Sequence, residues 1–591
     1  MDKMLTLAIV GSGGAGVIVT GEMCLQAVAY SGGYGHLRKS FGPQIRGGES
    51  AAILTLSPSP LEDSGEQCQC LFVLDWKNFD RFQDEIKLVE KPLIVVDEKA
   101  GTCPASLEKY SSSMITVAFS QLARENGSEK VNTVFLGYIG YLLGLHAPPI
   151  IKAIEKRFSQ KHAEFVALAL ANMESGYRHG ESEAPGQYAL QLKNHDTSPW
   201  ILTGNQGLAY GALKAGIRFV AAYPITPASD LLEWIAGHIE PLGGHLVQAE
   251  DELSAINMAI GGSYGGVPSM TATSGPGLSL MSEALGLAVS SEIPVVVMNV
   301  MRGGPSTGIP TKSEQSDFNL AVYGMHGDAP HVVIAPHSIG DTVVTGGWAV
   351  ALAEALQTVV IVLSDQRTGQ SIEVLPPPQE WQDKAQRLVR DSAGGEDYYR
   401  YYDTSSGISA MALPGDPGGI YTAEGLEHNQ RGTPSPRNAD HLQQLKKRQR
   451  KLLQFDFGEM AMELHEADHT TRGAVEVTDS LLICWGSVTA ATRQAARQLA
   501  SQGHSSRILC LRLLSPLPKM QIERHLNTAE IAFVVEQNHQ GQVFHYIRSL
   551  IESPTPLVSI ARPGPVSISS AEIVSSVMNA ANMGKENADA C

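Results

Sequence analysis

The feature that most constrains the fold is a series of short apolar runs between residues 221 and 317, each ending in a turn of polar or glycine residues. The runs and their turns are AAYPITPASD (221–230), HLVQAEDE (245–252), TATSGPG (271–277), VVVMNVMRGGPSTG (295–308) and EQSD (314–317). Apolar runs of this length that alternate with helical segments are typical of strands in an open α/β sheet. Ligands of such sheets lie outside the carboxyl ends of the strands, so the turns predict a binding site there.

The acidic triplet Glu250-Asp251-Glu252 stands where one of these strands ends and a helix begins. Glu252 lies four residues before Ile256 and shares its apolar helix face, so its carboxylate should point inward. A buried carboxylate is unfavourable without a partner, which favours a ligand or a cation beside Glu252. Alternatively, the acids stabilise the helix N-terminus through its dipole. We expect this for Asp251, whereas position alone leaves both interpretations open for Glu252.

The first and third turns of this series carry further candidates. Pro224 and Pro227 restrict the backbone around Ile225 and Thr226, which suits a side chain that must be held still, or simply a rigid turn. In the third turn, Gly275 of the SGPG sequence permits close approach of the backbone to a flat ring.

Two arginines stand in positions that suit anion binding. Arg302 ends a buried strand, where its forked and permanently charged guanidinium suits a carboxylate; the alternative is a structural bridge to Glu314 or Asp317. Arg46 precedes two glycines in a predicted loop, where backbone and guanidinium approach a ligand together; the alternative is a surface arginine beside a turn. Weaker candidates in the loop after Arg302 are Thr307 and Lys312.

Near the N-terminus, LTLAIVGSGGAG (5–16) is a predicted strand followed by a glycine-rich turn. Gly11, Gly13 and Gly16 match the G-x-G-x-x-G spacing, with Gly14 between them. The dinucleotide fingerprint also needs an Asp or Glu about twenty residues further on, and the segment AYSGGYGHLRK has none. We therefore do not favour an NAD site. We expect a turn at a helix N-terminus that either accepts a phosphate or packs tightly.

Composition limits the class of protein. A length of 591 residues predicts about three to five domains. The net charge of −17 argues against general nucleic-acid binding, so the basic segment HLQQLKKRQRKLLQF (441–455) is interpreted as a solvated amphipathic helix. The seven cysteines are scattered and form no iron–sulfur or zinc pattern, which suggests reduced thiols. The longest apolar run, VFLGYIGYLLGL (134–145), is too short to span a bilayer, and no signal peptide is recognised, so we expect a cytoplasmic protein without membrane partners.

Taken in this order, the motifs between residues 221 and 317 resemble the alpha subunits of 2-oxoacid:ferredoxin oxidoreductases, which use thiamine diphosphate. The resemblance implies that Glu252 contacts N1′ of the aminopyrimidine ring and that Thr226 and Arg302 contact the 2-oxoacid, as catalytic residues. A glutamate in an apolar pocket can share a proton with such a ring nitrogen, which promotes carbanion formation and attack on the keto carbon. The other cofactor contacts implied are Tyr223, Pro224, Ile225, Ser274 and Gly275. The other substrate contacts implied are Arg46, Thr307 and Lys312.

The resemblance spans nearly the whole chain and implies an α/β protein with several doubly wound domains. The expected parts are a gamma domain (1–180), a linker (181–200), a pyrimidine-binding alpha domain (201–375), a loop-rich inter-domain segment (376–475), a transketolase C-terminal-like domain (476–575) and a polar tail (576–591). The gamma domain is associated with coenzyme A in this family. The coenzyme A-associated residues implied are Gly11, Gly13, Gly14, Gly16 and Arg46.

Two parts of a complete thiamine enzyme are missing from the sequence. There is no Gly-Asp-Gly for the diphosphate and Mg²⁺, and no cysteine run for a cluster. The resemblance implies that a beta subunit supplies the Mg²⁺–diphosphate site and a [4Fe–4S] cluster, in an (alpha–beta)₂ heterotetramer with ferredoxin as electron acceptor. No metal is expected in this chain itself.

The fused gamma–alpha layout and the form GPSTG-x-PTK-x-EQSD look most like the 2-oxoglutarate type. That type converts 2-oxoglutarate, coenzyme A and oxidised ferredoxin into succinyl-CoA, CO₂ and reduced ferredoxin, and can run in reverse to fix CO₂. Pyruvate or branched-chain 2-oxoacids are the alternative substrates. A hypothesis of another class is a non-catalytic nucleotide-binding protein that uses Gly11–Gly16.

Overall fold

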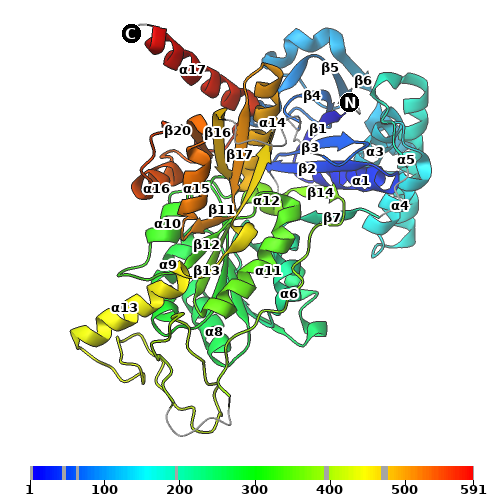
Figure 1. Cartoon of the computed structure of the whole chain (residues 1–591). Coiled ribbons are helices and arrows are strands. Elements are labelled where there is room, and N and C mark those ends of the chain that lie inside the picture. The colour runs from blue at the N-terminus through cyan, green and yellow to red at the C-terminus, as the bar shows by residue number, and fades with distance from the viewer. Residues whose placement is uncertain are drawn as a thin grey trace. The chain divides into compact units, whose positions relative to one another are not determined.

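The computed structural model forms two compact units, Met1–Thr203 with Gln370–Pro378, and Gly204–Gly369 with Gln379–Cys591 (Figure 1). Each unit is described by itself. The structure describes residues 4–42, 48–61, 65–193, 198–391, 398–466 and 477–589.

The first unit is built on an eight-stranded sheet of order β6-β5-β4-β1-β3-β2-β14-β7. Its strands are β1 (Leu5–Gly11), β2 (Tyr34–Phe41), β3 (Ser50–Ser57), β4 (Cys68–Val73), β5 (Leu88–Asp97), β6 (Met114–Val117), β7 (Trp200–Thr203) and β14 (Ile372–Leu375). One face packs on helices, because the apolar side of β1 and β3 shares a core with the helices that follow. The helices of this unit are α1 (Val17–Tyr30), α2 (Phe119–Glu125), α3 (Asn132–Leu142), α4 (Ala147–Arg157) and α5 (Ala163–Glu183).

Strands β7 and β14 close the edge of this first sheet, where β14 pairs with β2 and β7 in antiparallel register. The predicted pyrimidine-binding domain (201–375) began and ended with these two segments. The structure instead places both in the N-terminal unit, because β14 pairs with β2 and β7 pairs with β14. The second unit therefore begins at Gly204.

The second unit contains a seven-stranded sheet of order β18-β12-β13-β11-β10-β8-β9. Its strands are β8 (Phe219–Ala222), β9 (His245–Gln248), β10 (Ser269–Thr273), β11 (Val295–Met301), β12 (Val332–Ile334), β13 (Val359–Asp365) and β18 (Leu513–Ser515). All neighbouring pairs from β12 to β9 are parallel, as a doubly wound sheet requires. One face packs on α6 (Gly204–Ala215), α7 (Ser229–Ala236) and α11 (Ile339–Leu356), and the other on α8 (Glu252–Tyr264), α9 (Gly275–Ser290) and α10 (Phe318–Tyr323).

The same unit contains a five-stranded sheet of order β15-β17-β16-β19-β20. Its strands are β15 (Met462–Glu466), β16 (Thr478–Trp485), β17 (Ser506–Leu511), β19 (Ala529–Glu536) and β20 (Leu557–Ala561). Its helices are α14 (Thr489–Ser501), α15 (Lys519–Leu526), α16 (Gln542–Leu550) and α17 (Ser570–Asp589). After β17 the chain continues as β18, which pairs with β12, and Phe318 and Trp485 share one core, so the two sheets fold as one unit. Helix α17 runs through most of the segment that was predicted as a polar tail.

The predicted loop-rich segment contains one long helix, α13 (Asn438–Leu453), which runs beside irregular chain (Figure 1). Our interpretation of α13 as a solvated basic helix is wrong. Lys447 and Lys451 are buried, and both donate to the fully buried carboxylate of Glu292, at 2.7 Å and 3.0 Å. Charge attraction in the interior fixes this helix to the turn after α9, which sequence periodicity cannot reveal. No described helix is long and apolar enough to cross a membrane.

Candidate active site

The carboxyl ends of four adjacent strands, β11, β10, β8 and β9, bring the sequence motifs to one edge of the seven-stranded sheet. Strand β9 leads to the acidic triplet, β8 to Thr226, β10 to Ser274 and β11 to Arg302. These strands are parallel neighbours, so their ends meet. The predicted edge is confirmed for these motifs.

Glu252 begins helix α8 and is buried, with 7% of its surface exposed. Among the described residues, its carboxylate has no hydrogen-bond or ion-pair partner. The side chain lies against helix α9, because a Cβ added to Gly277 would meet its Cγ at 2.7 Å and Thr273 Oγ1 at 2.1 Å. Glycine at position 277 thus makes room for the acid. The prediction that Glu252 points inward is confirmed by this burial.

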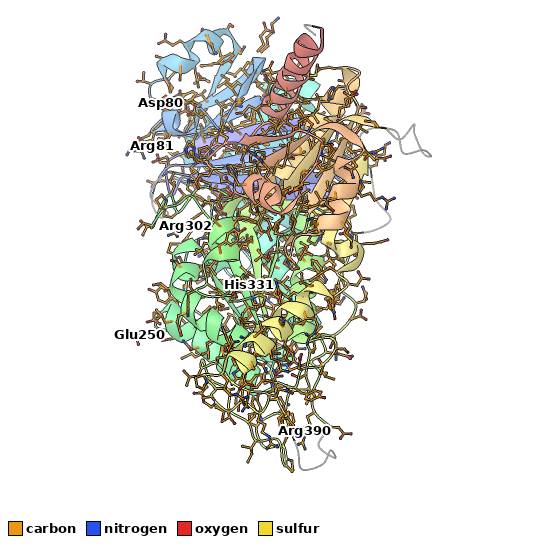
Figure 2. The ribbon with its side chains drawn as sticks, turned by 60° about the vertical axis from the view of Figure 1, so that its left-hand side comes forward. Asp80, Arg81, Glu250, Arg302, His331 and Arg390 are labelled. Atoms are coloured by element: carbon orange, nitrogen blue, oxygen red, sulfur yellow. The ribbon has the colours of Figure 1, made fainter. Side chains whose placement is uncertain are left out.

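Asp251 has the capping role that the sequence favoured. It is the N-cap of α8, and its carboxylate accepts a hydrogen bond from Ser254 N at 2.7 Å. This bond lowers the pKa of Asp251. Glu250 is exposed, at the outside of the molecule (Figure 2). Three consecutive acids therefore have three different environments, and only Glu252 is positioned to act on a ligand in the interior.

Arg302 and Thr226 lie together. The Arg302 guanidinium donates from Nη1 to the carbonyl oxygen of Thr226 at 2.6 Å, and Arg302 is 7% exposed (Figure 2). Asn205 of α6 donates from Nδ2 to the next carbonyl, that of Pro227, at 3.0 Å. Two side chains from different elements therefore brace the turn that carries Thr226.

Arg302 does not form the structural bridge that was the alternative in the sequence. Within the described ranges, its guanidinium has no ion-pair partner within 4.0 Å, and its Nε has no hydrogen-bond acceptor. Burial lowers the pKa of Arg302, while the charge of Asp317 raises it. A buried guanidinium with unused donors is available for an anion.

Asp317 and Asn299 are site residues that the sequence reasoning did not select. Asn299 Nδ2 donates to Asp317 Oδ2 at 2.9 Å, and a Cβ added to Gly275 would lie 2.8 Å from Asp317 Oδ1. Burial raises the pKa of Asp317. An Asn inside an otherwise apolar strand, VVVMNVM, was the signal that could have identified this pair.

The remaining predicted contacts lie farther out. Tyr223 is 39% exposed, Pro224 and Thr307 are exposed, and Ile225 and Lys312 are half-buried. They surround the same edge of the sheet, on the turn after β8 and the loop after β11. Arg46 lies outside the described residues.

The glycine-rich turn of the first unit differs from a dinucleotide site. Strand β3 lies antiparallel between β1 and β2, so the required parallel β-α-β unit is absent from these described strands. Asp75 Oδ2 accepts from both Ser12 N at 2.7 Å and Ser12 Oγ at 2.6 Å. A carboxylate thus already binds a donor that a phosphate would use.

A cavity of about 190 Å³ lies beside this turn. Gly14 and Gly16 line it together with Lys130 and the apolar rings of Phe158 and Phe165. Gly11 is instead buried against Leu74, where it supports packing. Of the glycines in the turn, Gly14 and Gly16 therefore border a small cavity that has both charged and apolar lining residues.

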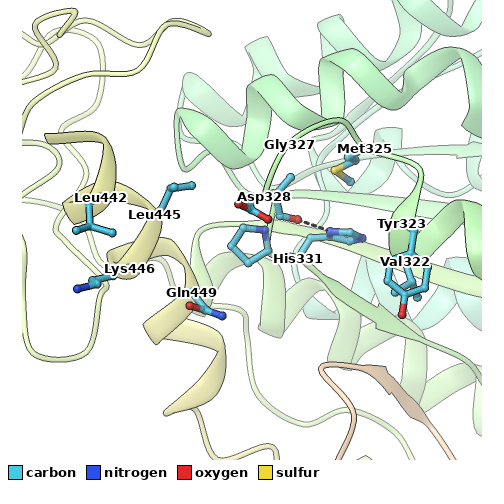
Figure 3. A pocket seen from close by; sticks show the side chains of 12 residues that line it. Val322, Tyr323, Met325, Gly327, Asp328, His331, Leu442, Leu445, Lys446 and Gln449 are labelled. Atoms are coloured by element: carbon cyan, nitrogen blue, oxygen red, sulfur yellow. Dashed lines mark hydrogen bonds between the residues drawn. The ribbon is translucent and has the colours of Figure 1, made fainter. Parts of the chain in front are cut away.

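A larger pocket of about 570 Å³ lies away from the motif-bearing edge (Figure 3). Helix α13 lines one side through Leu442 and Lys446. The other side is lined by Tyr323 at the end of α10 and by His331 in the loop before β12. Residue 331 precedes β12, so this pocket lies at the amino ends of the strands, opposite the edge of the candidate site. The pocket is therefore not part of the candidate site, although it is large.

The unpaired polar atoms of the candidate site fit a polar ring. Among the described residues, the buried polar atoms without a hydrogen-bond partner include four near this edge, and they are Asn205 Oδ1, Ser274 Oγ, Asn299 Oδ1 and Arg302 Nε. Buried polar groups are normally paired, so these four atoms indicate a ligand, water or partner group at this edge. No group of three or more described His, Cys, Asp or Glu residues could hold a metal ion.

Comparison with known proteins identifies the family. Residues 210–447 match the family model "Pyruvate flavodoxin/ferredoxin oxidoreductase, thiamine diP-bdg", residues 6–179 match "Pyruvate ferredoxin/flavodoxin oxidoreductase", and residues 478–573 match "Pyruvate:ferredoxin oxidoreductase core domain II". A 2-oxoacid:ferredoxin oxidoreductase subunit alpha of Sulfolobus sp is 31% identical, with 91% of each chain covered. The chain belongs to the 2-oxoacid:ferredoxin oxidoreductase family.

Two more members of the 2-oxoacid:ferredoxin oxidoreductase family are similar to it. A 2-oxoglutarate synthase subunit KorA of Archaeoglobus fulgidus is 36% identical over 58% of this chain and 89% of its own. The solved structure of 2-oxoglutarate:ferredoxin oxidoreductase from Magnetococcus marinus, with 2-oxoglutarate, coenzyme A and succinyl-CoA bound, is 32% identical with a TM-score of 0.89, covering 98% of this chain and 100% of that one. The predicted family and the thiamine-diphosphate-binding fold are confirmed.

Proposed function

We propose that this chain is the alpha subunit of a thiamine-diphosphate-dependent 2-oxoglutarate:ferredoxin oxidoreductase. The reaction converts 2-oxoglutarate, coenzyme A and oxidised ferredoxin into succinyl-CoA, CO₂ and reduced ferredoxin, and its reverse would fix CO₂. The observation that carries this proposal is Glu252, a buried acid with no partner among the described residues, at the carboxyl edge of a thiamine-type sheet. The substrate preference rests on the relatives named for 2-oxoglutarate.

The residues of the chain have separable roles in this reaction. When bound, thiamine diphosphate supplies the electron sink for decarboxylation. Glu252 would hold a proton at its carboxylate for N1′ of the aminopyrimidine, which would tune the ring for proton removal. Arg302 would bind the 2-oxoacid carboxylate through its unused donors, and Thr226 would orient the keto end. Ser274, Gly275 and the turn Tyr223-Pro224-Ile225 would hold the ring.

A beta subunit completes the site in this proposal. It supplies the Mg²⁺–diphosphate site and the [4Fe–4S] cluster, in an (alpha–beta)₂ heterotetramer that reduces ferredoxin. Support comes from the absence of a Gly-Asp-Gly sequence and of a cysteine cluster in the chain, and from relatives named as subunits. A cytoplasmic location fits the six described cysteines, all of which are free thiols.

We assign coenzyme A to the first unit. Gly14 and Gly16 border a cavity that offers Lys130 for an anion and phenylalanine rings for an apolar group, which suits part of a coenzyme A molecule. Gly11 and Gly13 support the turn. Thr307 and Lys312 remain proposed substrate contacts. Arg46 is proposed to bind the distal carboxylate of 2-oxoglutarate.

The test is a substrate panel on the complex of this chain with its beta subunit. We expect coenzyme A-dependent reduction of ferredoxin with 2-oxoglutarate, and a much lower kcat/KM with pyruvate or 2-oxoisovalerate. Arg46→Ala should reduce turnover of 2-oxoglutarate more than that of pyruvate. Equal losses would exclude Arg46 as the distal-carboxylate contact. A complex that binds thiamine diphosphate yet reduces no acceptor with any 2-oxoacid would refute the enzyme assignment.

A further inference from the structure

We infer that Gln315 is a positioning residue, through which the five-stranded domain holds Arg302 and Asp317 in the active site. This inference rests on the proposed function. Gln315 belongs to the segment that follows Arg302, and none of its surface is exposed. It lies between the two sheets of the second unit, where a buried amide must find partners.

Both the backbone and the side chain of Gln315 form hydrogen bonds to the five-stranded domain. Its backbone N donates to Gln537 O at 2.8 Å, and its side-chain Oε1 accepts from Gln537 N at 2.8 Å. Its Nε2 donates to Trp485 O at 2.8 Å, and its carbonyl accepts from Asn538 Nδ2 at 3.2 Å. All of these partners stand at the carboxyl ends of β16 and β19. One side chain thus joins the site segment to two strands of the other sheet.

The neighbours of Gln315 are held in the same way. Gln542 Nε2 donates to Ser316 O at 3.0 Å, while Gln542 Oε1 accepts from Asn319 N at 2.9 Å. Gln537 Nε2 donates to Ser313 O at 3.3 Å. Residues 313, 315, 316 and 319 are therefore all bonded to the segment 537–542, and Gln315 takes part in three of these six bonds.

The loop that holds Gln315 is itself rigid. The carboxylate of Glu536, which is fully buried, accepts from Asn538 Nδ2 at 2.6 Å and from the backbone N of Val543 and Phe544, each at 3.0 Å. Asn538 Oδ1 in turn accepts from Gly541 N at 2.8 Å. Glu536 and Asn538 therefore have a supporting role, because their bonds fix the partners of Gln315.

The two residues after Gln315, Ser316 and Asp317, connect it to the site. Ser316 Oγ donates to the carbonyl of Arg302 at 3.3 Å. Asp317 accepts from Asn299 and lies against Gly275, at the beginning of α9. A shift of Gln315 therefore moves the backbone of Arg302 and the carboxylate of Asp317 together. Misplacement of a reacting pair by about 1 Å can reduce turnover roughly 100-fold.

The five-stranded domain also leaves space for the amide of Gln315. Gly486 directly follows β16 and has φ +63°, and a Cβ added there would lie 2.4 Å from Gln315 Nε2. A side chain at this position would be strained and would displace the amide. Glycine is therefore required at residue 486 for the Gln315–Trp485 contact.

The test compares Gln315→Leu with Gln444→Leu in the assembled complex. Gln444 is equally buried, and its Nε2 donates to Tyr401 O at 3.3 Å, away from the site edge. Both variants lose buried hydrogen bonds, so a purely structural role predicts similar effects. We expect Gln315→Leu to raise KM for 2-oxoglutarate and lower kcat/KM by roughly 100-fold, with thiamine diphosphate still bound. Gln444→Leu should keep the wild-type KM.

A milder variant covers the case in which Gln315→Leu does not assemble. Gln542 is half-buried at the start of α16, and Gln542→Leu removes the bonds to Ser316 O and Asn319 N only. We expect the same rise in KM, at roughly one tenth of the size. Wild-type KM in either folded variant, or equal changes in Gln444→Leu, would overturn the positioning role. An inactive wild-type complex would instead refute the proposed function, which keeps the two failures distinct.

Discussion

Substitution of Glu252 by glutamine is the sharpest test of the active site. The change keeps the shape of the side chain, which matters because a Cβ at the neighbouring Gly277 would already lie 2.7 Å from Glu252 Cγ. It removes the carboxylate that shares a proton with the cofactor ring. General acid–base catalysis contributes roughly 10²- to 10⁴-fold, equivalent to about 3 to 5 kcal/mol of transition-state stabilisation. We therefore expect kcat to fall by that factor.

The stability of the same variant should change in the opposite direction. Glu252 is 7% exposed and has no partner among the described residues, so its charge is unfavourable in the free chain. A neutral amide of the same shape relieves about 1 kcal/mol of this unfavourable burial. We expect a higher melting temperature for the free Glu252→Gln chain, measured by calorimetry. Lower turnover with higher stability separates catalysis from folding.

The matched control is Glu250→Gln, two residues earlier on the same turn. Glu250 is exposed, so its variant loses the same charge without changing the interior. The assay is ferredoxin reduction with 2-oxoglutarate and coenzyme A at saturating thiamine diphosphate. Near wild-type turnover in Glu252→Gln, or equal losses in both variants, would refute the reasoning.

Three further predictions follow from the same geometry. Arg302→Lys keeps the charge but loses the fork, so KM for 2-oxoglutarate should rise roughly 10- to 100-fold in steady-state assays; an unchanged KM would exclude a carboxylate contact. Asp251→Ala removes the cap on Ser254 N and should lower the free energy of unfolding by about 1 kcal/mol in denaturant titrations, with kcat preserved in the complex. Burial lowers the pKa of Lys451 from 10.5 to about 7. Between pH 7 and pH 10 the unfolded chain therefore binds more protons than the folded chain, and the free energy of unfolding should rise with pH. Lys451→Met should flatten this rise, measured as the melting temperature against pH.

Much of the site could be predicted because it depends on local pattern. Short apolar runs that end in glycine and polar turns identified the parallel sheet and its carboxyl edge, and the helical spacing of Glu252 and Ile256 identified the buried acid. Asp251 was predicted to stabilise the N-terminus of the helix, and the structure shows that it does so as the N-cap. These features are set by residues close together in the chain, where backbone geometry fixes the direction of a side chain.

Features that depend on distant residues could not be predicted. Strand β14 joined the first sheet by pairing with β2, and β7 joined it by pairing with β14, and no local signal in four-residue strands reveals this. Lys447 and Lys451 appeared to belong to a solvated helix, but Glu292, more than 150 residues away, makes their burial possible. The pattern of charges along the helix does not reveal that Glu292 is the partner of these lysines.

The sequence by itself determined the kind of fold, the edge at which the site lies and which acid is buried, because strand ends and helix faces follow from local periodicity. Only the tertiary structure decided that Arg302 keeps unused donors, that Asn299 and Asp317 form a pair, and that Gln315 joins two domains. The physical reason is that hydrogen bonds and burial depend on which atoms meet in space. These contacts are set by the packing of whole helices and strands, and a short stretch of sequence does not determine them.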